Sequence, residues 1–215
     1  MPMSGTLEII RHTQQAYPES LAEQEARVAD ILSGKRPACM ILTEHPPLYT
    51  IGTSGSESDI LSREIDGEKI AVFSSGRGGE VTYHGPGQLV CYVLADLRHN
   101  QDLHKHVWHL EEMVIRTLAG FDIVSQRDPR GIGGWGGEGN KNANKIAAVG
   151  VRCRKWITFH GIALNINPNL KHFSGIVPCG MTDAPVTSMQ NEGCDASREA
   201  VEARLLPHAK ALFTS

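Results

Sequence analysis

The chain has 215 residues, of which 40% are hydrophobic and 21% charged, and its formal net charge is −3. This composition is typical of a globular protein with one large core, so we expect a single domain over residues 1–215. The charge balance and the lack of basic runs argue against a nucleic-acid or membrane partner. Five cysteines without CxxC spacing indicate free thiols, and the N-terminal residues match neither a signal nor a transit peptide. We therefore expect a cytoplasmic protein.

Hydrophobic patterning divides the chain into helices, with apolar residues at helical spacing, and strands, with short apolar runs. In chain order the patterns predict a helix over 20–32, a buried strand over 38–43, an irregular extended segment over 45–52, strands over 69–73 and 89–94, a helix over 102–118, paired strands over 143–152 and 156–167, and a helix over 197–213. Strands mixed with isolated helices, without a regular βαβ repeat, favour an α+β fold with a mainly antiparallel or mixed sheet flanked by helices.

The run from Arg77 to Gln88, RGGEVTYHGPGQ, joins two of the predicted strands. Its glycines let the backbone approach a ligand closely, while Val81 to Tyr83 favour extended structure. Arg77 and His84 add a charge and a titratable ring. The run predicts a ligand cradle carried on strands, and the alternative is a glycine-rich hairpin with a surface histidine.

A second stretch, Gly131 to Asn144, is rich in glycine and asparagine. Because it has few apolar side chains to bury, we expect a mobile surface loop or an irregular hairpin. A lid next to a functional site is the alternative.

Cys179 differs from the other cysteines because it lies between a proline and a glycine. A turn at this point would present the thiol to a substrate, as a nucleophile requires. Cys39 and Cys91 lie in apolar runs and are expected in the core, whereas Cys153 is expected in a strand and Cys194 in a polar loop.

A thiol with a pKa of about 8.5 is mostly protonated at neutral pH, so a nucleophilic cysteine needs a nearby cation or base. The candidates are His84, Lys145 and His160, each in or next to a predicted strand. Lys145 precedes Ile-Ala-Ala-Val-Gly, whose small side chains leave room for a ligand chain beside the ammonium. The alternative for Lys145 is an ordinary surface lysine.

Three histidines, His104, His106 and His109, raise a different class of function, a metal-binding or regulatory module. Their spacing does not place all three on one helical face, and no cysteine or carboxylate motif accompanies them. We therefore expect solvent-exposed helix histidines and no metal site.

Five groups of residues form a specific combination of motifs: 45–52 (HPPLYTIG), 77–88 (RGGEVTYHGPGQ), 145–150 (KIAAVG), 158–165 (TFHGIALN), and 176–180 (IVPCG) with 186–188 (VTS). Together they resemble the octanoyltransferases of lipoate biosynthesis, and the resemblance is strongest over residues 37–189. The resemblance implies the fold of the biotin and lipoate protein ligase catalytic domain. It also implies the reaction, transfer of an octanoyl group from acyl carrier protein to a lysine of a lipoyl domain.

The resemblance assigns roles to particular residues. Cys179 matches the family's acyl-thioester nucleophile, and Lys145 matches the lysine that lowers the pKa of that cysteine and serves as general acid and base. The positions of the family's substrate site are matched by Arg77, Gly78, Gly79, Glu80, Val81, Thr82, Tyr83, His84, Ala148, Val149, Gly150, Gly161, Ile162 and Ala163. The octanoyl chain is expected against Val81, Ala148 and Ile162.

The implied partners are octanoyl-acyl carrier protein, which carries the acyl group on its phosphopantetheine arm, and the lipoyl domains of 2-oxoacid dehydrogenase E2 subunits and of glycine cleavage H protein. No cofactor, nucleotide or metal is expected, and we expect a monomer.

The chain departs from the family just before Lys145, where a compact Gly-Val-Trp strand usually leads into the lysine. The stretch Gly131 to Asn144 leaves that entry strand open, and it makes Lys141 a competitor, although Lys141 lacks the following Ile-Ala-Ala. The rival function is an ATP-dependent lipoate or biotin ligase of the same fold. The Pro-Cys-Gly sequence at Cys179 argues against it.

Overall fold

The computed structural model describes residues 6–136, 143–177 and 185–214. Its main sheet has seven strands in the order β1-β2-β8-β12-β11-β10-β9. These strands are β1 (Glu8–Arg11), β2 (Cys39–Thr43), β8 (Gln88–Leu94), β9 (Ser125–Asp128), β10 (Gly131–Gly136), β11 (Asn144–Arg154) and β12 (Ile157–Asn165). β1 pairs with β2 in parallel and the other neighbours pair antiparallel. The predicted α+β fold with a mixed, mainly antiparallel sheet is confirmed.

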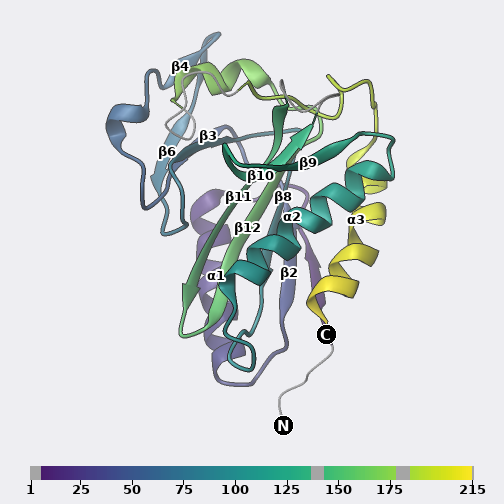
Figure 1. The fold of residues 1–215 in the computed structure, drawn as a ribbon. Coiled ribbons are helices and arrows are strands. Elements are labelled where there is room, and N and C mark those ends of the chain that lie inside the picture. The colour runs from purple at the N-terminus through teal and green to yellow at the C-terminus, as the bar shows by residue number, and fades with distance from the viewer. Residues whose placement is uncertain (1–5, 137–142, 178–184, 215) are drawn as a thin grey trace.

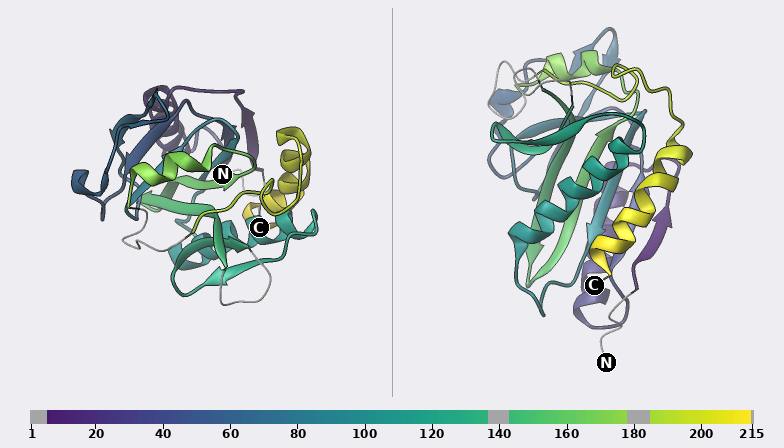
Figure 2. Two further views of the ribbon diagram at one scale, coloured as in Figure 1. Left: turned by 90° about the horizontal axis from the view of Figure 1, so that it is seen from above. Right: turned by 45° about the vertical axis from the view of Figure 1, so that its right-hand side comes forward.

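Helices cover both faces of the main sheet (Figures 1 and 2). α1 (Tyr17–Leu32) packs against β12 and β8 on one face. α2 (Leu103–Ala119) and α3 (Arg198–Phe213) lie side by side on the other face. Each face therefore has an apolar core of its own. Among the described residues, no helix combines the length and the apolar character that a membrane span requires.

A second, three-stranded sheet lies at one end of the main sheet, at the upper left of Figure 1. It consists of β3 (Leu48–Ile51) between β6 (Ala71–Ser74) and β7 (Val81–His84), and it is accompanied by the hairpin of β4 (Glu64–Ile65) and β5 (Glu68–Lys69) and by the short 3-10 helices η1 (Glu57–Asp59) and η2 (Leu170–Gly175). β7 leads through a short turn into β8, so the Arg77–Gln88 run joins the two sheets.

Most predicted elements are observed with ends shifted by a few residues. The predicted strand 69–73 is an exception, because it is divided between β5 and β6 with Ile70 outside both. The hydrophobic side chain of Ile70 is buried in the core of the small sheet, which explains why the sequence pattern runs through the break.

Of the two expectations for Gly131 to Asn144, the surface loop is wrong for residues 131–136, which form the largely buried strand β10 between β9 and β11. The irregular hairpin fits these residues, since β10 pairs antiparallel with β11 and their register shifts between Gly134 and Trp135. Trp135 is fully buried, and its Nε1 donates a hydrogen bond to the carbonyl oxygen of Gly131 at 2.8 Å. The glycines allow close packing rather than mobility, since a Cβ at Gly133 would collide with the carbonyl oxygen of Ala147. Residues 137–142 lie outside the described residues.

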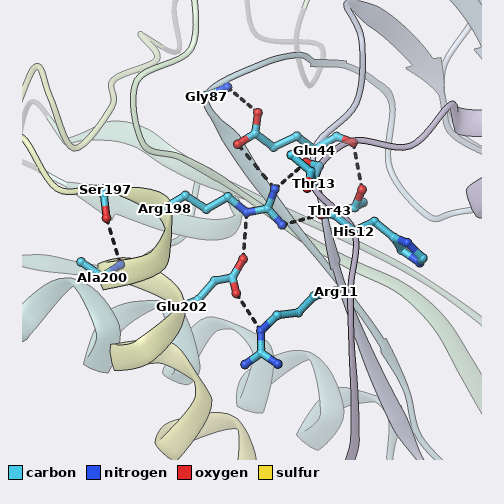
Figure 3. A network of polar contacts seen from close by, with 10 residues as sticks. All are labelled: Arg11, His12, Thr13, Thr43, Glu44, Gly87, Ser197, Arg198, Ala200 and Glu202. Atoms are coloured by element: carbon cyan, nitrogen blue, oxygen red, sulfur yellow. Dashed lines mark hydrogen bonds and ion pairs between the residues drawn. The ribbon is translucent and has the colours of Figure 1, made fainter.

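An ion-pair network holds α3 against the start of the chain and the turn between β7 and β8 (Figure 3). Arg198 donates to the carbonyl oxygen of His12 at 2.7 Å and to the carboxylate of Glu202 at 2.8 Å. Its guanidinium also lies 3.8 Å from the carboxylate of Glu44. Glu44 in turn accepts the backbone N–H of Gly87 at 3.0 Å. The network therefore fixes the turn that ends the glycine-rich run.

Candidate active site

A largely apolar cavity of about 290 Å³ lies where β7 and the loop before it cover β8, β11 and β12. All of the predicted substrate-site residues except Tyr83 line it. They are Arg77, Gly78, Gly79, Glu80, Val81, Thr82, His84, Ala148, Val149, Gly150, Gly161, Ile162 and Ala163. The hydroxyl of Tyr83 is instead hydrogen-bonded to Nδ1 of His172 at 2.8 Å, within the core of the small sheet.

The register of β11 and β12 explains why separate motifs meet at the cavity. Ala148 pairs with Ala163, Val149 with Ile162 and Gly150 with Gly161, so the two motifs form adjoining rows of one wall. The Gly78 N–H donates to the carbonyl oxygen of Val151 at 2.8 Å and attaches the glycine-rich run to the edge of this wall.

Lys145 lines the cavity from the start of β11. Its backbone N–H donates to the carbonyl oxygen of Pro185 at 2.9 Å, and its own carbonyl oxygen accepts the N–H of Thr187 at 3.0 Å. Its Nζ lies 5.5 Å from the ring centroid of Trp135, within the range of a cation–π contact. The lysine is therefore fixed both through its backbone and through its side chain.

β10 supplies the space for the Lys145 side chain. A Cβ on Gly133 would lie 2.9 Å from Cε of Lys145, and Gly133 has a φ of 147°, which other residues rarely adopt. Glu111 of α2 accepts the Gly133 N–H at 3.0 Å and an N–H of Arg127 at 3.0 Å. The entry strand that the sequence left open is present, and α2 holds it in place.

Arg77 fixes the loop that covers the cavity. Its guanidinium donates to the carbonyl oxygen of Thr50 at 2.7 Å and to that of Glu80 at 2.8 Å. A Cβ on Gly150 would lie 3.0 Å from Cδ of Arg77, so glycine on β11 lets the arginine lie against the strand. Arg77 therefore contributes to the shape of the site as well as to its charge.

His84 belongs to a buried hydrogen-bond chain that sequence reasoning did not foresee. Its Nδ1 is hydrogen-bonded to Oε1 of Gln88 at 2.8 Å, and Nε2 of Gln88 donates to Oδ1 of Asn165 at 2.9 Å. Asn165 then donates to the carbonyl oxygen of Thr187 at 2.9 Å. Gln88 and Asn165 close two of the matched motifs, but only the fold shows that they link the glycine-rich run to the segment beside Lys145.

The candidate bases differ in charge. Burial lowers the pKa of His84 to about 3 and that of His160 to about 4, so both rings are neutral at pH 7. A neutral ring provides no positive charge that would stabilise a thiolate. Both histidines line the cavity, and of the three candidates Lys145 is the one whose side chain carries a charge suited to that task.

The four cysteines that the structure describes fall into two groups, with Cys39 and Cys91 in the core and Cys153 and Cys194 partly buried. Cys39 and Cys91 are buried, as predicted, and burial raises the pKa of Cys39 to about 12 and raises that of Cys91 further. Cys153 lies on β11 with its pKa raised by burial. Cys179 and its predicted turn lie outside the described residues, as does Lys141. The role of Cys179 therefore stays a prediction.

The expectation of solvent-exposed histidines on α2 is wrong for His106, which is buried against Phe213 and has its pKa lowered by burial to about 4. His104 is exposed and His109 is half-buried. Within the described ranges, no group of three or more histidine, cysteine and acidic side chains could hold a metal ion.

Comparisons with known proteins agree with this architecture. The family model of the lipoyl protein ligase A/B catalytic domain matches residues 16–210. An octanoyltransferase of Rhodospirillum rubrum is 46% identical over 202 residues, which cover 94% of this chain and 92% of that protein. An octanoyltransferase of Nitrobacter hamburgensis is 49% identical over 199 residues, with 90% and 80% covered.

Solved structures share the fold at low sequence identity. A putative lipoate protein ligase from T. acidophilum superposes with a TM-score of 0.72 at 19% identity, covering 98% of this chain and 85% of that one. The biotin protein ligase from Aquifex aeolicus gives a TM-score of 0.51 at 12% identity, with 95% and 68% covered. The fold expectation is thereby confirmed. The chain belongs to the lipoyl protein ligase A/B catalytic domain family and, within that family, to the octanoyltransferases.

Proposed function

We propose that this enzyme moves an octanoyl group from the phosphopantetheine thioester of acyl carrier protein to a lysine of a lipoyl domain, through a thioester on Cys179. The observation that carries the proposal is the apolar cavity with Lys145 fixed in its wall. Pro185, which accepts the Lys145 N–H, borders the segment that contains Cys179. In this proposal the enzyme acts as a cytoplasmic monomer without a cofactor.

In the first half-reaction the Cys179 thiolate attacks the octanoyl carbonyl carbon. The new bond to Cys179 forms as the bond to the pantetheine sulfur breaks, and the Lys145 ammonium gives that sulfur a proton. An ammonium favours the thiolate by about 1.4 kcal/mol for each unit by which it lowers the pKa of the thiol. One thioester replaces another, so this step is close to thermoneutral.

In the second half-reaction the amine of the target lysine attacks the acyl-enzyme. Neutral Lys145 accepts the proton that the amine loses, and the Cys179 thiolate leaves. The product is an amide, which is more stable than a thioester, so the second step makes the overall transfer favourable. Backbone N–H groups near Gly85 or Gly180 stabilise the oxyanion in this scheme.

The lining of the cavity suits the acyl group. Val81, Ala148 and Ile162, against which the octanoyl chain is expected to lie, all line it. Each buried methylene contributes about 0.8 kcal/mol before the costs of binding are subtracted. An eight-carbon chain therefore supplies enough binding energy to hold the substrate carbonyl near Lys145.

Transfer without ATP separates this function from that of the ligases of the same fold, one of which was solved with ATP bound. Purified protein is incubated with octanoyl-acyl carrier protein and a lipoyl domain in a buffer free of nucleotide. The mass of the lipoyl domain is then measured by mass spectrometry. We expect one added octanoyl group. An absolute requirement for ATP, or use of free octanoate in preference to the carrier-bound group, would contradict the proposal.

A further inference from the structure

Four polar side chains that line the substrate cavity lie near one another, and we call this part of the cavity its polar end. They are Tyr17 of α1, Tyr92 of β8, His160 of β12 and Arg77, in a cavity lined elsewhere mainly by apolar side chains and glycines. The ring centroids of Tyr92 and His160 are 6.2 Å apart, and Arg77 is close enough to Tyr17, Tyr92 and His160 to affect the pKa of each. The four side chains come from four separate segments of the chain. Polar side chains in an otherwise apolar cavity favour a ligand that has a hydrogen-bonding group at the same place.

The polar end lies about one acyl chain away from the lysine. From Lys145 to Val151, the partner of His160, β11 advances by about 20 Å at about 3.3 Å per residue. The lysine side chain covers part of this length, since its Cε lies beside Gly133, which pairs with Ala148. The stretch from Ala148 to Val151 measures about 10 Å, close to the length of an extended eight-carbon chain.

Two polar atoms at this end form no hydrogen bond with any residue that the structure describes. They are the hydroxyl oxygen of Tyr17 and Nε2 of His160, and the two residues are only 3% and 2% exposed. Ser75 lies near the Tyr17 hydroxyl without the geometry of a hydrogen bond. Buried polar groups are nearly always paired, so unpaired atoms in two residues that line a cavity indicate that a polar atom of a ligand, or a water, pairs with them there.

His160 is held at this place by its backbone. Its φ is 61°, unusual for a histidine in a strand, and its N–H donates to Oε1 of Gln24 on α1 at 2.9 Å. The pairing of β12 with β8 starts only at the next residue, Gly161. Such a conformation persists where surrounding contacts fix it, and it is concentrated at functional sites. Gln24 is therefore a positioning residue for the His160 ring.

We propose that Tyr17 and His160 form a polar subsite at the inner end of the acyl cavity, which selects eight-carbon chains over longer ones and accepts an acyl chain that ends in a hydroxyl group. The inference rests on the proposed octanoyl transfer. The methyl end of an octanoyl group stops at the subsite, whereas two further methylenes would press against the polar atoms and keep them from pairing.

A terminal hydroxyl has the complementary chemistry. It donates to Nε2 of neutral His160 and accepts the hydrogen of the Tyr17 hydroxyl, so both unpaired atoms gain a partner. The subsite thus extends the substrate class from octanoyl to 8-hydroxyoctanoyl thioesters.

The test compares kcat/KM for octanoyl-, decanoyl- and 8-hydroxyoctanoyl-acyl carrier protein. Tyr17→Phe removes one hydroxyl, and His160→Gly removes the ring while tolerating the positive φ. The matched control is Tyr49→Phe, since the Tyr49 hydroxyl is also buried but donates to the carbonyl oxygen of His172, outside the cavity.

We expect the wild type to use 8-hydroxyoctanoyl at a rate comparable to octanoyl and to discriminate against decanoyl about tenfold or more. Tyr17→Phe lowers the 8-hydroxyoctanoyl to octanoyl ratio about tenfold, and His160→Gly raises the decanoyl to octanoyl ratio by a similar factor. Tyr49→Phe leaves both ratios as they are. Each ratio is internal to one variant, so a change in overall rate does not disturb the comparison.

Rejection of 8-hydroxyoctanoyl by the wild type would overturn the subsite without any variant. The subsite would also be overturned if both kcat/KM ratios in Tyr17→Phe and His160→Gly equalled those of the wild type. A wild-type enzyme that transfers no octanoyl group from any carrier would instead contradict the proposed function itself, so the two failures are distinguishable.

Discussion

At the scale of single residues, the position of the Lys145 side chain depends on Gly133, whose lack of a side chain leaves space for it. Gly133→Ala would place a methyl group against Cε of Lys145 and the carbonyl oxygen of Ala147. We expect transfer to slow at least tenfold, because small displacements of a reacting group cost that much. Gly67→Ala is the control, since Gly67 also has a positive φ but faces open space. It should cost about 1 kcal/mol of stability and leave the transfer rate intact.

The choice between two nearby lysines is also decided at this scale. Lys145→Ala should slow formation of the acyl-enzyme about a hundredfold or more, because it removes the ammonium that favours the thiolate and protonates the leaving group. Lys141→Ala should have little effect. Single-turnover acylation is measured for both, with circular dichroism to show that the fold is retained. Equal losses in the two variants would contradict the role assigned to Lys145.

At the scale of elements, α3 is attached through Arg198 rather than through apolar contacts alone. Arg198→Ala removes the donor to the carbonyl oxygen of His12 and leaves Arg11 as the remaining donor to the carboxylate of Glu202 (Figure 3). We expect a loss of about 2 kcal/mol in the free energy of unfolding. The control Arg116→Ala breaks an exposed pair with Glu112 one helical turn away and should cost less than about 1 kcal/mol. Urea unfolding measures both, and equal losses would refute the role of the network.

The sequence predicts a helix or strand correctly where the spacing of its apolar residues matches the residues that the fold buries. The helices around α1, α2 and α3 and the strands β2, β8, β11 and β12 were foreseen because their apolar residues follow the period of the structure. β10 was not, since close packing against Ala147 and Lys145 requires glycine, and glycine in a sequence resembles a loop. The sequence of α2 predicts an exposed His106, because the burial of this ring depends on Phe213, which is far away in the chain.

At the scale of the whole molecule, the site is assembled from motifs that the sequence already separates clearly. The glycine-rich run and the two motifs on β11 and β12 line one cavity, as their resemblance to a family implied. The sequence does not predict the polar end, because Tyr17 and Gln24 belong to α1. Tyr17 lines the same cavity as His160, and Gln24 contacts His160, only when that helix packs on the sheet. Sequence motifs therefore predicted the wall of the cavity but not its inner end.

Buried neutral histidines should make the stability of the molecule depend on pH. Burial, with a smaller contribution from His109, lowers the pKa of His106 from 6.5 to about 4. As pH falls below 6.5 the unfolded chain binds a proton that the folded chain refuses, so stability decreases until pH reaches about 4. At pH 5 this residue alone costs about 2 kcal/mol relative to pH 7.

His106→Gln should therefore reduce the difference in unfolding free energy between pH 7 and pH 5 by about 2 kcal/mol. His104→Gln, on the same helix but exposed, should leave that difference as it is. Urea titrations at the two pH values provide the measurement. An unchanged difference in the His106 variant would show that the ring is accessible to protons in the folded state.

The central claim is that octanoyl transfer proceeds through Cys179, and intact-protein mass spectrometry tests it most directly. The enzyme is incubated with octanoyl-acyl carrier protein without acceptor, digested and mapped, alongside Cys179→Ser and the control Cys153→Ser. We predict one octanoyl adduct on Cys179 in the wild type and in the Cys153 variant, and none in the Cys179 variant. An adduct on Cys153 or Cys194, or full transfer activity in Cys179→Ser, would contradict the account.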